Sequence, residues 1–241
     1  MKTLRRIPGG DESETFSFRY GKEEFILRVS PSAAGFEKDA FASKHFGRHA
    51  LPVPEILHIG EIDAHRYCSI SRRLPGLTLQ DLNEQKLPAV LDATAQVLRE
   101  IASSDISGIT GFGPFDANGT GRYRTWREFL LSPAPDFAPL AYLASYCPEI
   151  RCLVHGDFGS NNVLTDGRRI TGVLDWSEAM IGDPLYDIAN IFFWRGWLVC
   201  MEQQARWFEA RLGHIPNWRE RLLCYQLVIG LKETRVTATA V

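Results

Sequence analysis

Residues 153–164 read Leu-Val-His-Gly-Asp-Phe-Gly-Ser-Asn-Asn-Val-Leu, and residues 170–176 read Ile-Thr-Gly-Val-Leu-Asp-Trp. The apolar runs predict short strands and the polar residues between them predict loops, so Asp157, Asn162 and Asp175 can converge on one site. Phosphoryl transfer needs a carboxylate that takes the proton of the attacking hydroxyl, and hard oxygen ligands that hold Mg²⁺. Asp157 can be that base, while Asn162 and Asp175 can hold the metal. Asp and Asn also favour ordinary turns, and the surrounding sequence must decide between these two readings.

The composition is that of an ordinary globular chain. Of 241 residues, 45% are hydrophobic and 23% are charged, with 20 Gly and 13 Pro, which excludes collagen, a disordered polymer and a coiled coil. The net charge of −2 does not favour nonspecific binding to nucleic acid. We see no membrane span, no signal sequence and no Cys-x-x-Cys motif among the cysteines. We therefore expect a cytoplasmic monomer with reduced thiols and with neither a membrane nor a nucleic-acid partner.

The first part of the chain is rich in strand patterns. Residues 15–20 and 25–29 predict a hairpin, and residues 56–59 and 67–71 predict a second pair of strands. Between the two pairs, the spacing of apolar residues predicts a helix over residues 36–50.

Beyond the turn at residues 74–76 the patterns become mainly helical. Helices are expected over residues 87–101, from Asp183 through residue 200, and from Asn217 to residue 231. Strands first and helices afterwards predict an α+β fold. We place a small, β-rich N-terminal lobe at residues 1–73 and a larger, helical C-terminal lobe at residues 74–241.

The motif His-Gly-Asp-x-x-x-x-Asn at residues 155–162, followed by Leu-Asp-Trp at residues 174–176, resembles the aminoglycoside phosphotransferase family, whose fold is like that of protein kinases. The resemblance covers most of the chain, and further phrases carry it at residues 111–115, 125–127, 175–180 and 189–195. It implies a two-lobed kinase that uses ATP or GTP and Mg²⁺. The implied acceptor is a hydroxyl of an aminoglycoside of the hygromycin B type, so that the product would confer antibiotic resistance.

The resemblance also assigns residues to the nucleotide site. It places Arg28 where the family normally has a phosphate-binding Lys, and Asp39 where it usually has Glu. A longer cation and a shorter anion can keep the reach of the ion pair, although the two could also be a surface pair of little energetic worth. The phosphates are expected under Gly10 and Ser13, and the nucleotide base against the backbone near Ser71.

Other side chains are expected to support the site or to contact substrate. His155 would shape the catalytic loop, and Asp187, by resemblance, would brace it from the following helix. The excess of acidic side chains around the motif would attract a polycationic antibiotic, and Glu178 and Asp183 are the expected contacts. Metal binding and helix capping are alternative explanations for such carboxylates.

Two further features admit an ordinary explanation. His45 and His49, if one helical turn apart, could formally bind a metal, but without a third ligand we expect a solvated helix face. The aromatic residues at positions 192–194 and 197 are expected in the core rather than on a stacking platform.

Compared with the family pattern, the chain looks shortened before the first strand, between Phe129 and Cys147, and after Leu231. The three prolines in residues 132–139 cannot sustain a helix there, so we expect part of the substrate cleft to be missing or rebuilt. Two other functions stay open: a kinase for another small hydroxylated metabolite, and a truncated, non-catalytic protein that binds nucleotide or is inert.

Overall fold

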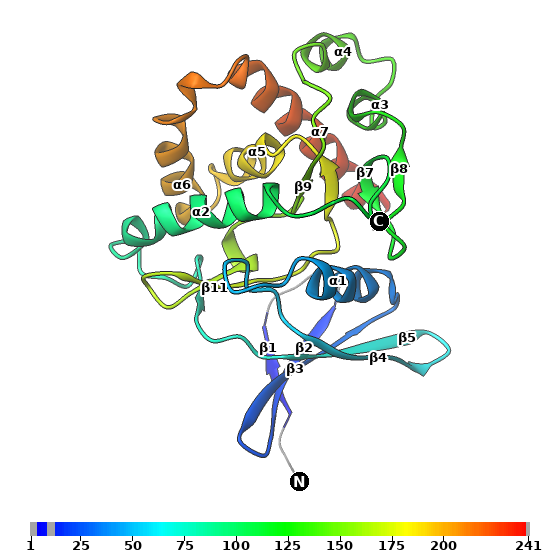
Figure 1. Ribbon diagram of the computed structural model, residues 1–241, viewed down its shortest axis with the longest axis vertical. Coiled ribbons are helices and arrows are strands. Elements are labelled where there is room, and N and C mark those ends of the chain that lie inside the picture. The colour runs from blue at the N-terminus through cyan, green and yellow to red at the C-terminus, as the bar shows by residue number, and fades with distance from the viewer. Residues whose placement is uncertain (1–3, 9–12, 240–241) are drawn as a thin grey trace.

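A sheet with one helix forms the smaller body of the molecule, and helices with two small sheets form the larger one (Figure 1). The computed structural model describes residues 4–8 and 13–239, and of residues 235–239 the backbone only. Within these ranges, no helix is long and apolar enough to cross a membrane.

The sheet of the smaller body has five strands in the order β1-β2-β3-β5-β4, and every neighbouring pair is antiparallel. The strands are β1 (Arg5–Ile7), β2 (Glu14–Tyr20), β3 (Glu23–Ser30), β4 (Ile56–Asp63) and β5 (Arg66–Arg72). Gly21 has a φ of 64° in the turn between β2 and β3, a conformation that glycine adopts without steric penalty. Both predicted strand pairs are confirmed.

Helix α1 (Ala34–His45) lies beside this sheet (Figure 1) and buries Phe36, Asp39 and Ala42. It ends earlier than residue 50, where the sequence pattern predicted its end. The N–H groups of Phe46 and Gly47 both donate to the carbonyl of Ala42, at 2.9 and 3.2 Å, which closes the last turn of the helix. His49 therefore lies outside the helix, and the proposed helical spacing of His45 and His49 is wrong.

The larger body contains two small sheets that lie beside its helices (Figure 1). One has the order β11-β10-β6 and the other the order β8-β7-β12-β9. Their strands are β6 (Leu77–Thr78), β7 (Phe112–Phe115), β8 (Gly121–Tyr123), β9 (Cys152–Val154), β10 (Val163–Thr165), β11 (Ile170–Val173) and β12 (Met180–Gly182). Strand β6, just after the turn at residues 74–76, pairs with β10; the lobe boundary at residue 73 stays a prediction.

Helix α5 lies at the centre of the larger body, between α2, α6 and α7 (Figure 1). The α-helices here are α2 (Leu91–Ala102), α3 (Trp126–Leu131), α4 (Ala138–Ala144), α5 (Leu185–Trp194), α6 (Val199–Glu209) and α7 (Trp218–Thr239), and the 3₁₀ helices are η1 (Leu87–Val90), η2 (Ser160–Asn162) and η3 (Leu212–His214). The fully buried rings of Trp126, Tyr186 and Tyr225 pack together with centroids 5.7 to 5.9 Å apart. These rings form part of the hydrophobic core of the larger body.

The helices differ from the sequence patterns in two places. The helix expected from Asp183 through residue 200 is two helices, because α5 ends at Trp194 and α6 begins only at Val199. Residues 132–137 are not helical, as expected, but α4 begins at Ala138 with a proline in its first turn. There the missing N–H of proline has no helical partner to lose.

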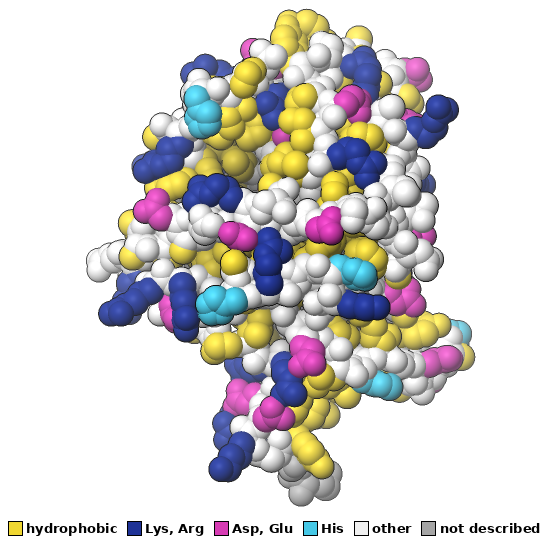
Figure 2. All heavy atoms as spheres, viewed as in Figure 1, with side chains coloured by type: hydrophobic (Ala, Val, Ile, Leu, Met, Phe, Trp, Pro, Cys, Tyr) yellow, Lys and Arg dark blue, Asp and Glu magenta, His cyan; other side chains and the backbone are white. Residues whose placement is uncertain are grey.

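Oppositely charged side chains are interspersed on the face shown in Figure 2, and hydrophobic side chains gather over the larger body.

Candidate active site

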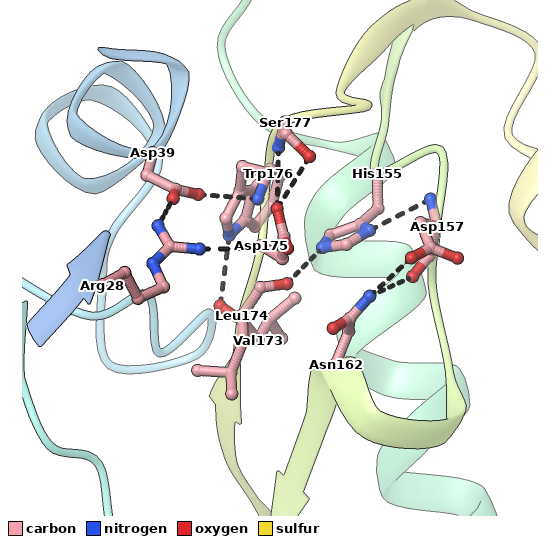
Figure 3. Close-up of polar contacts among 10 residues, drawn as sticks. All are labelled: Arg28, Asp39, His155, Asp157, Asn162, Val173, Leu174, Asp175, Trp176 and Ser177. Atoms are coloured by element: carbon pink, nitrogen blue, oxygen red, sulfur yellow. Dashed lines mark hydrogen bonds and ion pairs between the residues drawn. The ribbon is translucent and has the colours of Figure 1, made fainter. Parts of the chain in front are cut away.

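The carboxylate of Asp157 is held by amide groups from two sides. Asn162 donates its Nδ2 to the Asp157 Oδ2 at 2.7 Å and to the Asp157 carbonyl at 3.0 Å (Figure 3). From α5, the buried Asn190 donates to Oδ1 at 3.3 Å. These donors orient the carboxylate in the loop that follows β9.

Asp157 also has the electrostatics of a base. The residue reaches solvent, yet the protein atoms packed around it and, second, the charge of Asp175 raise the pKa of its carboxyl to about 6. A higher pKa makes a carboxylate a stronger proton acceptor while leaving it largely ionised near neutral pH.

His155 shapes the catalytic loop as a neutral ring. Its Nε2 lies 2.9 Å from the Leu174 carbonyl, and its Nδ1 accepts the N–H of Asp157 at 3.3 Å (Figure 3). These two partners require the tautomer with the proton on Nε2. Complete burial lowers the pKa of His155 to about 4, so the ring stays uncharged and fixes the backbone of Asp157, as expected.

Asp187 on α5 braces the same loop, as the sequence predicted. Its two oxygens accept the N–H groups of His155, at 2.9 Å, and of Gly156, at 2.8 Å. Burial raises the pKa of Asp187 to about 7, against the effect of these two donors. Gly156 has a φ of 88°, and a Cβ there would lie 2.2 Å from the Glu178 carbonyl, so only glycine fits at this turn.

Asn162 and Asp175 are brought together by neighbouring strands. Strands β10 and β11 pair Val163 with Val173, and the N–H of Leu174 donates to the Asn162 carbonyl at 2.8 Å. Asp175 is the next residue, and its Oδ1 accepts the Ser177 hydroxyl at 2.7 Å. The catalytic loop and the hairpin thus gather Asp157, Asn162 and Asp175, as expected (Figure 3).

The donors present fit a magnesium ion that is bound together with nucleotide. Because Nδ2 of Asn162 faces Asp157, the side-chain oxygen of Asn162 points away from that carboxylate. The Asp175 side chain is 44% exposed. Mg²⁺ is typically held by one or two protein oxygens, substrate phosphates and water. Over residues 4–8 and 13–239 there is no group of three or more His, Cys, Asp or Glu that could hold a metal without such help.

Arg28 on β3 and Asp39 on α1 form the predicted ion pair through Nη2 and Oδ2 (Figure 3). Their side chains are only 19% and 6% exposed, so the alternative of a surface pair is wrong. The Nη1 of Arg28 lies 3.8 Å from Asp175 Oδ2. Burial lowers the pKa of Arg28, and the charge of Asp175 opposes this effect. The guanidinium therefore reaches from the sheet to the metal-ligand candidate.

The remaining nucleotide residues are placed only in part. Ser13 directly precedes β2, and Ser71 lies on β5, where it pairs with Ile26 of β3 and Ile56 of β4. Gly10 lies outside the described residues. The contacts of Gly10, Ser13 and Ser71 with nucleotide stay predictions.

Glu178 and Asp183, the two acidic residues expected to contact substrate, differ in how far their side chains are exposed. The Glu178 side chain is 49% exposed and pairs with Lys232 at 3.0 Å, so it remains accessible. Asp183 is 1% exposed, and its carboxylate accepts from the Arg221 guanidinium at 2.6 Å and from the Tyr225 hydroxyl at 2.5 Å. A buried, neutralised carboxylate cannot meet a substrate without leaving these partners, and the substrate role expected for Asp183 is therefore wrong.

A pocket next to the catalytic loop contains an aromatic side chain that the sequence analysis placed in the core. Trp197 is 69% exposed and lines the pocket together with Gln80 and Glu84. The Ser160 hydroxyl donates to Gln80 Oε1 at 2.7 Å, which joins the pocket wall to the catalytic loop. The expectation of a core position is wrong for Trp197.

Sequence reasoning also missed Lys38 and the catalytic-loop contact of Asn190. Lys38 donates from Nζ to the carbonyls of Ser177, at 2.5 Å, and of Ala179, at 2.8 Å. No motif signals such a contact, since backbone carbonyls leave no mark on the sequence. Asn190 could have been noticed as a polar residue among the apolar residues of α5.

A β-rich body joined to a helical one, with a carboxylate base beside an amide and a second carboxylate, defines a phosphotransferase of the kinase-like class. The profile of the phosphotransferase enzyme family matches residues 3–223, and the chain belongs to that family. It is similar to the hygromycin-B 4-O-kinase of Escherichia coli, with 48% identity over 254 residues that cover 97% of this chain and 74% of the relative. The viomycin phosphotransferase of Streptomyces vinaceus is 35% identical over 58% of this chain and 43% of its own.

The likeness extends to solved structures. A thermostable mutant of aminoglycoside phosphotransferase APH(4)-Ia, crystallised as a ternary complex with AMP-PNP and hygromycin B, superposes with a TM-score of 0.89. The two chains are 48% identical, and the match covers 95% of this chain and 84% of that one. The predicted family and the predicted two-lobed, protein-kinase-like fold are confirmed.

Proposed function

We propose that the protein transfers the γ-phosphoryl group of a nucleoside triphosphate to a hydroxyl of hygromycin B or a closely similar aminoglycoside. The observation that carries this proposal is the convergence of Asp157, Asn162 and Asp175 at the end of the β10–β11 hairpin. The acceptor follows from the 48% identity to hygromycin-B 4-O-kinase and from the antibiotic bound in the similar structure.

The arrangement supports an in-line transfer. The acceptor oxygen attacks the γ-phosphorus, and its proton passes to a carboxylate oxygen of Asp157. The bond from the γ-phosphorus to the β–γ bridging oxygen breaks and releases the nucleoside diphosphate. Asn162 and Asp175 would hold Mg²⁺, which supplies positive charge to the phosphates. Arg28 would add a second positive charge, held in place by Asp39.

The nucleotide would occupy the space between the two bodies. Its phosphates would lie near Gly10 and Ser13, and its base near the backbone of Ser71. Whether the base is adenine or guanine depends on backbone groups of this strand, and the AMP-PNP of the similar structure favours adenine.

The acceptor would be recognised by charge and by shape. Glu178 offers an accessible carboxylate to the amines of an aminoglycoside, and the pocket beside the catalytic loop offers the exposed ring of Trp197. A transferred phosphate adds about −1.5 to −2 charges. The modified drug would lose the positive complementarity that it needs for an anionic target, which would confer resistance.

Turnover of nucleotide in the presence of hygromycin B tests the proposal. We expect hygromycin-dependent release of nucleoside diphosphate by the wild type and its loss in Asp157→Asn, while Asp92→Asn, a change at an exposed aspartate on α2, keeps the wild-type rate. Equal turnover in wild type and Asp157→Asn would contradict the role of Asp157.

A panel of acceptors separates the alternatives. Phosphorylation of another hydroxylated amine or sugar, without hygromycin-dependent turnover, would point to a metabolite kinase. Nucleotide-dependent thermal stabilisation without any turnover would point to a non-catalytic binder, and no stabilisation would point to an inert protein.

A further inference from the structure

Two adjacent side chains of α1 hold the backbone that follows Asp175. Asp39 accepts the N–H of Trp176 on its Oδ1 at 2.7 Å. Lys38 donates from Nζ to the carbonyls of Ser177, at 2.5 Å, and of Ala179, at 2.8 Å. Asp39 thus binds one backbone donor and Lys38 binds two backbone acceptors. Both ends of the short segment from Trp176 to Ala179 are therefore attached to α1.

The segment needs such support because the residue just before it has an unusual backbone conformation. Asp175 has a φ of 56°, in the left-handed region that residues with a Cβ rarely adopt. A conformation of this kind persists where the surroundings hold it in place. Within the segment the Ser177 hydroxyl already binds Asp175 Oδ1, and the carbonyl of the same Ser177 binds Lys38.

The surroundings of Lys38 are those of a fixed group rather than of a surface lysine. The side chain is half-buried, and its Nζ lies 5.2 Å from the centroid of the Phe115 ring. An aromatic face and two carbonyls partly replace the water that a buried ammonium loses. The charges that act on Lys38 are those of Glu178, Lys232 and Asp175. Burial lowers the pKa of Lys38 to about 8, and the charge of Lys232 adds to this effect, while the carboxylates of Glu178 and Asp175 oppose it.

We propose that Lys38 is a positioning residue for phosphoryl transfer: through the carbonyls of Ser177 and Ala179 it holds Asp175 in the geometry that binds magnesium-nucleotide. The inference rests on the proposed function, because it takes Asp175 as a metal ligand. Lys38 touches neither nucleotide nor acceptor in this scheme. It acts on the orientation of one carboxylate, and therefore on the magnesium-dependent part of nucleotide binding.

Helix α1 also positions Arg28, the proposed phosphate-binding cation. Asp39 pairs with Arg28 through its second oxygen, so α1 fixes Arg28 and Asp175 relative to each other. The alignment of cation and metal ligand is therefore built into the packing of one helix and exists before nucleotide binds.

The test compares Lys38→Met with Lys44→Met, a change of an exposed lysine on the same helix. Calorimetry measures the affinity for AMP-PNP with excess Mg²⁺ and with EDTA. Loss of a group that orients a metal ligand typically weakens metal binding about 10- to 100-fold. We expect Lys38→Met to weaken binding in Mg²⁺ by about tenfold and to leave binding in EDTA unchanged. Lys44→Met should match the wild type in both, and Lys38→Arg, which keeps the charge and the donors, should recover most of the loss.

The outcomes separate this proposal from the proposed function. Equal weakening of binding in Mg²⁺ and in EDTA, or no weakening by Lys38→Met, would overturn the positioning role while leaving the kinase intact. A wild type that binds AMP-PNP no better with Mg²⁺ than with EDTA would overturn both. If Lys38→Met does not fold, Lys38→Ala, which also removes the donors, is measured in the same way, and an unchanged Mg²⁺ dependence would again overturn the proposal.

Discussion

Arg28 on β3 and Asp39 on α1 form a largely buried ion pair, and the second oxygen of Asp39 accepts the N–H of Trp176 at 2.7 Å. One carboxylate therefore connects the sheet, the helix and the segment that follows Asp175. Because the Asp39 side chain is only 6% exposed, water screens these contacts weakly and cannot replace them.

Removing the Asp39 charge should destabilise the fold and the site together. Breaking a buried pair leaves an uncompensated charge and typically costs about 3–5 kcal/mol. We expect Asp39→Asn to lower the free energy of unfolding by about 3 kcal/mol, at the low end because Arg28 still faces Asp175. Urea unfolding measures the change. A loss no larger than that of Asp81→Asn, which changes an exposed aspartate, would show that the pair contributes little.

Replacing Asn190 should disturb the base without touching substrate. Its amide donates to Asp157 Oδ1 and to the Phe158 carbonyl, both at 3.3 Å, and Asn190→Leu removes both donors. A misplaced catalytic group can lower kcat by up to about 10²-fold. Since the Asn190 donor lowers the pKa of Asp157, its loss should raise that pKa and move the acidic limb of the pH–rate profile to higher pH. An unmoved limb with a lowered kcat would mean that Asn190 acts only through packing.

The parts of the site that could be predicted are those that a motif or a charge pattern encodes. Asp157, Asn162 and Asp175 were predicted because phosphoryl transfer requires these residue types, and the Arg28–Asp39 pair because the resemblance places these residues where the family has Lys and Glu. Lys38 could not be predicted, because its partners are backbone carbonyls far along the chain, which any residue could supply.

The fold, like the site, has parts that the sequence predicts and parts that it does not. Hairpins and lobe order have local patterns, and they were predicted. The break between α5 and α6 was not, since only Arg195 and Gly196 interrupt the apolar residues that end α5 and resume at Trp197. Asp183 was misassigned because a carboxylate near the motif looks the same in sequence whether it faces solvent or the buried guanidinium of Arg221.

His155 should make stability depend on pH. Its pKa is about 4 in the folded protein against about 6.5 in an unfolded chain, so its contribution is complete above pH 6.5 and is lost as the pH falls towards 4. Over these 2.5 pH units the loss is on the order of 3 kcal/mol. Asp187, whose pKa of about 7 lies above the unfolded value, acts in the opposite direction over much of this range.

The contribution of His155 to stability is therefore measured as the difference between wild type and a variant without the imidazole. We expect the stability gap between wild type and His155→Gln to narrow as the pH falls from 6.5 to 4, because only the wild type has an imidazole that binds a proton in the unfolded chain over this range while it stays neutral in the folded protein. Urea midpoints at several pH values measure this gap. A gap that stays constant over the range would mean that the pKa of His155 is the same in the folded protein and in the unfolded chain.

Glu178 and Asp183 should respond to amide substitution in opposite ways. Glu178→Gln removes an exposed charge whose pair with Lys232 contributes at most about 1 kcal/mol, so stability should hardly change. Loss of an interaction of that size with a cationic acceptor would raise the KM for hygromycin B about fivefold.

Asp183→Asn leaves the buried Arg221 guanidinium without its counter-charge and should lower the free energy of unfolding by about 3–5 kcal/mol. In the fraction that remains folded, KM should stay at the wild-type value, because the carboxylate of Asp183 faces the core. A raised KM in Asp183→Asn at a temperature where the variant is fully folded would return Asp183 to the substrate site, and an unchanged KM in Glu178→Gln would remove Glu178 from it.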